Sequence, residues 1–192
     1  MNLSELLTFL HIAAAIIWLG AGFLLAVLVF AAERAGDRAR EGAYHRDVAW
    51  LAPRLFIPSS MATLIFGILL VIDGDWGFDQ LWITVALAGW AISFSLGFFY
   101  FRPEGERIGG LVEEHGPGHP EVAGRLHRLN IVDRMQVTLL FLMVADMVVK
   151  PSGDDGGVLV AGAAILAAVV VLGLAGIRRG PAPDAGAESA RP

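Results

Sequence analysis

Residues 8–20 read TFLHIAAAIIWLG and form the middle of an apolar run that extends from Leu6 to Phe30. A run of about 20 apolar residues is long enough to cross the ~30 Å hydrocarbon core of a bilayer as a helix. The run nevertheless contains an ionisable side chain, His11. The stretch therefore predicts a membrane-spanning helix in which a histidine needs a partner.

The composition of the whole chain agrees with a membrane protein. Of its 192 residues, 56% are hydrophobic and only 17% are charged, which is more apolar material than a soluble domain of this length can hide. The net charge of −5 says little about partners, because the distribution of charge matters more than its sum in such proteins. The chain has no cysteine, so any metal or haem would take His, Met or carboxylate ligands.

Apolar runs of spanning length recur along the chain. They predict an all-α, polytopic helix bundle in one transmembrane domain, residues 1–178, with a four-helix core and one peripheral helix. Residues 179–192 are rich in Pro, Ala and Gly and predict a disordered tail. The five predicted spans cover residues 6–30, 55–72, 81–101, 129–149 and 158–177. Pro120 is expected to begin the helix that contains the fourth span.

Arginine is distributed unevenly between the connecting segments. Residues 31–54 hold five arginines, while DGDWGFDQ (73–80) holds three aspartates and no base. Further arginines precede the fourth span and follow the fifth, which places every arginine-rich segment on one side. Because such segments stay in the cytoplasm, we expect the N-terminus outside and the C-terminus inside.

The helix face through His11 collects mostly small residues, with Trp18 two turns further on. Such a face lets another helix or a flat ligand approach closely. Two interpretations stay open at this point: a neutral histidine hydrogen-bonded to a neighbouring helix, or an axial ligand to haem or copper. An ionisable residue within a membrane usually faces the protein interior in either case.

A second group of candidate residues lies at the outer end of the fourth span, where Met143, Met147 and Lys150 share a helix face. At ~1.5 Å per residue, Met143 lies about 10 Å and His11 about 8 Å below the outer ends of their helices. A site shared by His11 and the methionines is therefore expected near the outer surface. Asp146 and Lys150 also have the spacing of a helical ion pair, and Lys150 could hold an acidic group of a ligand.

The remaining histidines are predicted to lie near the inner surface. The stretch EEHGPGHPE (113–121) contains His115 and His119, but its Gly-Pro-Gly core prevents a helical i, i+4 pair, so a solvated loop is expected. His45 and His127 stand beside arginines, which predicts positions at the membrane interface.

Three stretches resemble known families. LHIAAAIIWLGAGF (10–23) is similar to the first helix of the CopD-type copper-resistance proteins and of the HemJ-type protoporphyrinogen oxidases. RLFIPSSMATLIFGILLV (54–71) resembles their second helix, and RLNIVDRMQVTLLFLMVADMVVKP (128–151) resembles the fourth HemJ helix, including Asn130. The resemblance is greatest to a group of bacterial predicted integral membrane proteins of unknown function. It covers the first four spans.

In the HemJ-type enzymes the first-helix histidine is regarded as a haem ligand, so the resemblance implies that His11 binds haem. Two of their basic residues are missing here. Phe23 stands near the place of an arginine, and LWITVAL (81–87) lacks the lysine that follows the tryptophan. The resemblance therefore implies haem binding more strongly than it implies protoporphyrinogen oxidation.

We expect a protein of the bacterial inner membrane, in contact with the lipid bilayer and not with nucleic acid, that binds haem b and has a redox role. The candidate cofactor-binding residues are His11, Trp18, Met143, Met147 and Lys150, with His11 as the metal ligand. A methionine, or a second His11 across a homodimer, would complete a six-coordinate iron. The alternatives are a copper-handling or copper-transporting protein and a non-catalytic membrane scaffold.

The predicted topology can be tested with reporter fusions. Fusions after Asp75 and Asp154 should report the outside, and fusions after Arg40, His115 and Gly180 should report the inside, because the arginine-rich segments stay in the cytoplasm. Alkaline phosphatase activity, which requires export, would measure the first pair. A reversed result at Asp75 and Asp154 would contradict the predicted orientation.

Overall fold

The structure is a computed structural model and describes residues 2–180. The described chain is helical and contains no strand. The predicted disordered tail lies outside the described residues from position 181 onward. In chain order the helices are α1 (Leu3–Arg34), α2 (Arg38–Leu51), η1 (Ala52–Phe56), α3 (Ile57–Asp73), α4 (Leu81–Leu96), η2 (Gly97–Phe101), α5 (Arg102–His115), α6 (Pro120–Val149) and α7 (Gly156–Arg179).

Two of the long helices contain a π turn. η1 joins α2 to α3 and η2 joins α4 to α5 without a break in the helix. Pro53 lies inside the first π turn, and Pro103 lies two residues after the end of the second. A proline has no N–H to give to the preceding turn, so the regular hydrogen-bond ladder cannot continue through it and the helix widens locally. In both helices the π turn lies between an apolar half (α3 or α4) and a charged half (α2 or α5).

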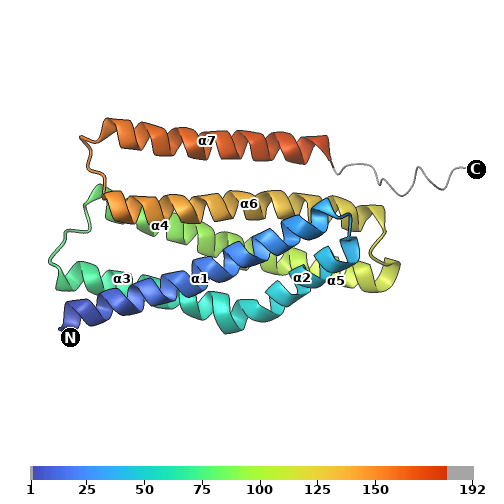
Figure 1. Cartoon of the computed structure of the whole chain (residues 1–192), viewed down its shortest axis with the longest axis horizontal. Helices are drawn as coiled ribbons and strands as arrows, with labels where there is room; N and C mark the ends of the chain where they lie inside the picture. The colour runs from blue at the N-terminus through green and yellow to red at the C-terminus, as the bar shows by residue number, and fades with distance from the viewer. Residues whose placement is uncertain (1, 181–192) are drawn as a thin grey trace, which may run out of the picture.

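The helices run roughly along one axis (Figure 1). α1 packs mainly on α3, and α4 packs on α6. α7 packs on α6, at the outside of the bundle (Figure 1). By length and apolar composition, four helices can cross a membrane: α1, α2 with α3, α4 with α5, and α7. The predicted fourth span lies in α6, which begins at Pro120 as expected and carries Asp133, Arg134 and Asp146 within that span.

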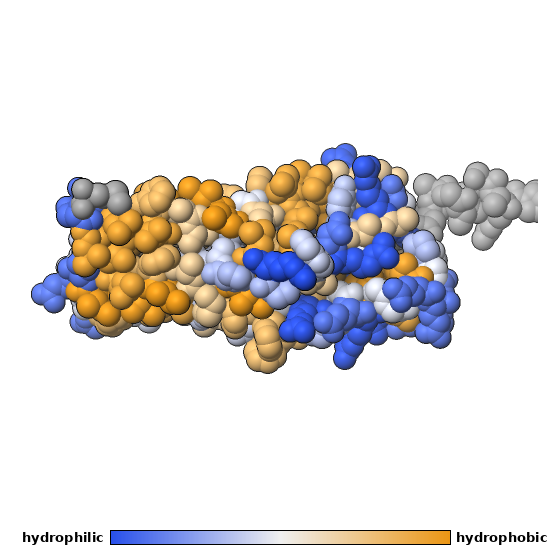
Figure 2. All heavy atoms as spheres, turned by 90° about the horizontal axis from the view of Figure 1, so that it is seen from below, coloured by the Kyte–Doolittle hydropathy of each residue, from blue (hydrophilic) through white to orange (hydrophobic). Residues whose placement is uncertain are grey.

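The surface divides into an apolar length and a charged end. Figure 2 shows hydrophobic residues over much of one face and hydrophilic residues gathered at the end where α2, α5 and the start of α6 lie. We call this the Arg-rich end and the opposite one, with Asp73, Asp75 and Lys150, the acidic end. Many large apolar side chains on α1, α3 and α7 are exposed, as expected where lipid is the solvent.

The Arg-rich end is a packed helical layer. The sequence suggested a solvated loop at residues 113–121, but α5 extends to His115 and α6 begins at Pro120, and the two helices bury Ile108, Val122 and Leu126 between them. Arg125 of α6 donates to Glu104 of α5 at 2.7 Å, and Glu104 and Glu121 raise the pKa of its guanidinium. The apolar stripe is short and interleaved with charge, so it resembles a loop when hydropathy alone is considered.

A buried polar chain ties this layer to α2. His45 Nε2 donates to the Asn130 side-chain oxygen at 2.9 Å, and the Asn130 amide nitrogen donates to the Glu41 carboxylate. Asn130 is 1% exposed, and both of its partners are also buried. His45 is thus buried inside the helical layer, where its ring meets Asn130, while the neighbouring Arg46 is exposed. Its position at the membrane interface stays a prediction.

Asn130→Ala should destabilise the protein by about 2–4 kcal/mol, because it leaves buried partners on both sides without a hydrogen bond. Thr138→Ala, on the same helix, removes only a bond to the Arg134 carbonyl and is expected to cost under about 1 kcal/mol. Unfolding in mixed micelles with increasing dodecyl sulfate measures both. Equal effects of the two changes would contradict a special role for Asn130.

Candidate functional site

A cavity of about 550 Å³ opens between α1, α3, α4 and α6 near the acidic end. We call it the His11 cavity. All five sequence-predicted site residues line it: His11, Trp18, Met143, Met147 and Lys150. Its volume falls within the ~300–1,000 Å³ typical of small-molecule and cofactor sites. The structure thus brings the predicted residues to one place, while their role in binding stays a prediction.

His11 is anchored to the neighbouring helix. Its Nδ1 lies 2.9 Å from the Thr63 carbonyl oxygen of α3. A carbonyl can only accept, so Nδ1 carries the proton in this hydrogen bond, and the lone pair of the neutral ring then resides on Nε2. One ring nitrogen is thereby used for structure, and the other is left as an acceptor or metal ligand.

Gly67 makes this contact possible. A Cβ at Gly67 would lie 3.0 Å from His11 Cε1 and 3.2 Å from Nδ1. Gly67 is four residues after Thr63, one helical turn on, so the missing side chain leaves the Thr63 carbonyl open to a second donor. The close packing of α1 on α3 thus depends on a glycine at this position.

Met143 occupies a similar notch on the other helix pair. A Cβ at Gly89 of α4 would lie 2.8 Å from both Cγ and Sδ of Met143, so the methionine side chain fills the space that the glycine leaves. Met147, one turn further along α6, packs against the buried cluster of Val71, Trp82 and Ile83. Both thioethers therefore belong to the wall of the cavity opposite the α1–α3 pair.

Lys150 closes the mouth of the cavity. It ends α6 in a left-handed conformation, with φ +50°. Its ammonium lies 4.4 Å from the Trp76 ring and 5.0 Å from the Trp82 ring, within the range of cation–π attraction. The ion pair expected between Lys150 and Asp146 does not form: one Asp146 oxygen is buried without a hydrogen-bond partner. The left-handed turn directs the lysine toward the tryptophans instead.

The other sequence candidates lie elsewhere. His115 and His119 approach across the turn between α5 and α6, with ring centroids 4.7 Å apart, although they do not share a helix. His119 caps α6 by accepting from the Glu121 N–H. His127 contacts the Gly176 carbonyl of α7 at 3.1 Å. Within residues 2–180 no cluster of three or more His, Cys, Asp or Glu side chains could hold a metal ion.

A second, smaller cavity lies toward the Arg-rich end. We call it the Ser93 cavity; Trp18 and Leu140 line both cavities and separate them. Sequence reasoning did not identify Ser93 or Gln136, which line this cavity, because single polar residues in apolar helices carry no spacing signal. The signal that could have found them is burial, which depends on how the helices pack.

The apolar helices, the charged end and the interior cavities together define a polytopic helical membrane protein. A family model described as "Predicted integral membrane protein (DUF2269)" matches residues 5–151. The chain belongs to this family. The matched residues include both cavities and exclude α7. No curated protein and no solved structure is significantly similar to the chain.

Gly67→Ala should destabilise the protein by about 1–3 kcal/mol, because the added methyl group presses on the His11 ring and strains its bond to Thr63. Gly20→Ala is the matched control, since a Cβ there meets nothing within 4 Å. The dodecyl sulfate unfolding curve measures both variants. If Gly67→Ala is as stable as Gly20→Ala, the close contact with His11 does not hold the helices together.

Proposed function

We propose that this protein binds haem b in the His11 cavity, with His11 as an axial ligand, and takes part in electron transfer in the membrane. The observation that carries the proposal is the hydrogen bond from His11 Nδ1 to a backbone carbonyl inside a large apolar cavity. Metal-ligating histidines usually donate their other N–H to a carbonyl or carboxylate, which fixes the ring and leaves Nε2 for the metal.

The residues around the cavity fit a haem group. Its walls are almost entirely apolar, which suits a porphyrin ring, and Lys150 stands at the mouth with a positive charge for a propionate. The aromatic rings of Trp76 and Trp82 hold this lysine in place. Met143 or Met147 could supply a second axial ligand from the opposite wall, with a second His11 across a homodimer as the alternative. Bound haem would supply one-electron redox chemistry.

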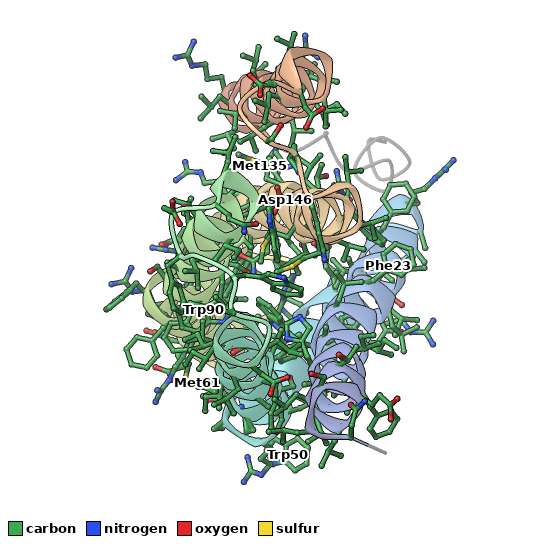
Figure 3. The ribbon with its side chains drawn as sticks, turned by 90° about the vertical axis from the view of Figure 1, so that its left-hand side faces the viewer. Phe23, Trp50, Met61, Trp90, Met135 and Asp146 are labelled. Carbon is green, nitrogen blue, oxygen red and sulfur yellow. The ribbon has the colours of Figure 1, made fainter. Side chains whose placement is uncertain are left out.

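The structure gives reason to set protoporphyrinogen oxidation aside. Phe23, near the place of a base in the HemJ-type enzymes, is 46% exposed and packs edge-on against Phe141 on the outside of the bundle (Figure 3). Ile83, which follows Trp82, is buried in the cavity wall. In the part of the chain that the structure describes, Lys150 is thus the one Lys or Arg side chain that lines this cavity. A tetrapyrrole substrate would bring several carboxylates, and a single lysine could not neutralise them.

Copper handling is the second candidate, because one histidine and two thioethers line the same cavity and soft sulfur ligands suit Cu(I). A non-catalytic scaffold, in which His11 only joins α1 to α3, is the third.

For orientation we propose five spans in the bacterial inner membrane, with the Arg-rich end in the cytoplasm and the N-terminus outside. The gathering of α2, α5 and the start of α6 at one end supports this orientation (Figure 1).

The absorption spectrum of the purified protein tests the haem proposal. We expect a Soret band in the wild type and none in His11→Ala, since the coordinate bond is lost while the helix becomes more apolar and still inserts. His115→Ala, at the other end of the molecule, should keep the band. The proposal would be contradicted by a wild type that shows no Soret band after reconstitution with haemin, or by a His11→Ala spectrum that is unchanged. Copper analysis of the same purified protein tests the second candidate.

A further inference from the structure

The Ser93 cavity has a volume of about 130 Å³ and lies between α1, α4, α6 and the α2–α3 helix. Both π turns reach it: Ala52 and Phe56 of η1 and Gly97, Phe98 and Phe101 of η2 line its wall. π turns within α-helices are uncommon and often mark functional sites. Here two of them, from different helices, widen the backbone around one space.

Two polar side chains that line this space each carry an oxygen atom without a partner. The hydroxyl oxygen of Ser93 and the amide oxygen of Gln136 are buried and form no hydrogen bond. Ser93 is only 1% exposed, so it cannot reach bulk solvent. A buried polar group left unpaired costs about 1–3 kcal/mol, and two on facing helices are a feature that a bound ligand would explain.

The rest of the wall limits what such a ligand can be. It is largely aromatic and aliphatic: Trp18, Phe56, Phe94, Phe98, Phe101 and Leu140. One acidic and one basic side chain, Asp133 and Arg102, also line it, so the cavity does not favour an ion of either sign. An engineered apolar cavity of about 150 Å³ binds benzene, so one six-membered ring fits this volume. Gln136 Oε1 and the Asp133 carboxylate are acceptors and call for a hydroxyl-bearing ring.

We propose that the Ser93 cavity binds the ring of a single-ring, lipid-soluble hydroquinone, that is, a quinol. One hydroxyl donates to Gln136 Oε1, and the other pairs with the Ser93 hydroxyl. The aromatic residues contact the faces and edge of the ring. Phe98 is 43% exposed and also lines the cavity, so the wall reaches the lipid-facing surface, where the tail of the quinol remains.

A quinol satisfies this cavity better than water. A water bound to Ser93 and Gln136 would leave the aromatic part of the wall uncovered. The ring covers the apolar wall while its two hydroxyl groups reach the two orphan atoms. Binding at this place does not depend on the haem proposal, because His11 lies in the other cavity, beyond Trp18 and Leu140.

Binding can be measured through stability, because a ligand that binds only the folded state raises the unfolding temperature. The probe is 2-decyl-1,4-hydroquinone, whose ring carries no substituent besides the tail, kept reduced under argon, with the full-length protein in nanodiscs and calorimetric detection. In the wild type we expect a saturable rise of about 5 °C at a probe concentration 100-fold above Kd. The oxidised form, 2-decyl-1,4-benzoquinone, should bind more weakly, since it offers no donor to Gln136.

Three variants make the test specific. Ser93→Ala with Gln136→Leu should weaken binding about tenfold or more, because both hydrogen bonds are lost. Gly97→Leu keeps both polar atoms and fills the cavity; a Cβ there meets nothing within 4 Å. It should abolish the rise. Ser95→Ala, two residues after Ser93 but exposed on the outside of α4, is the matched control and should keep the rise.

The His11→Ala variant separates the quinol proposal from the haem proposal. It should lose haem and keep the quinol-induced rise in unfolding temperature. No saturable rise in the wild type would show that the cavity holds water only and would overturn the proposal. An equal rise in the wild type and in Gly97→Leu would place the probe elsewhere and would also overturn it. The unfolding temperature without ligand, recorded for each variant, shows which of them are folded.

Discussion

The packing of α1 on α3 depends on the hydrogen bond between His11 and the Thr63 carbonyl. A polar group in hydrocarbon must find its partner inside the protein, because no water is available to replace it. The partner here is a backbone carbonyl already used within α3, and Gly67 leaves it open to a second donor. The contact draws α1 onto α3, fixes the protonated nitrogen of His11, and so decides which nitrogen a ligand could meet.

Glycines also allow close packing of α6 on α4 and on α7. Met143 fills the notch at Gly89, and Met135 of α6 fills another beside Gly173 of α7; Figure 3 shows Met135 between these two helices. Two helix pairs held this way leave space between them instead of a continuous core. Trp18 and Leu140 divide that space into an apolar cavity with a histidine and a smaller one with unpaired polar atoms. Two cavities with different linings thus lie side by side in one bundle.

The charged end shows where reasoning from hydropathy stops. The α5 helix mixes charge with an apolar stripe, so it resembles a loop in sequence although it packs as a helix against the start of α6. Asn130 could be singled out by its resemblance to a family motif, but not its link to Glu41 and His45, which are 89 and 85 residues away. Such partners become visible only when α2 is placed against α6.

The sequence by itself determined the membrane class and the approximate positions of the apolar helices, because the length and apolarity of each run are local properties and fix whether it can cross a bilayer. It also indicated His11 and its depth relative to Met143, since both follow from helical rise. Tertiary structure decided the rest: that Thr63 holds His11, that Lys150 turns onto two tryptophans and away from Asp146, and that Ser93 and Gln136 face a shared cavity. These facts depend on how helices distant in sequence rotate and approach one another, and no local pattern encodes that rotation.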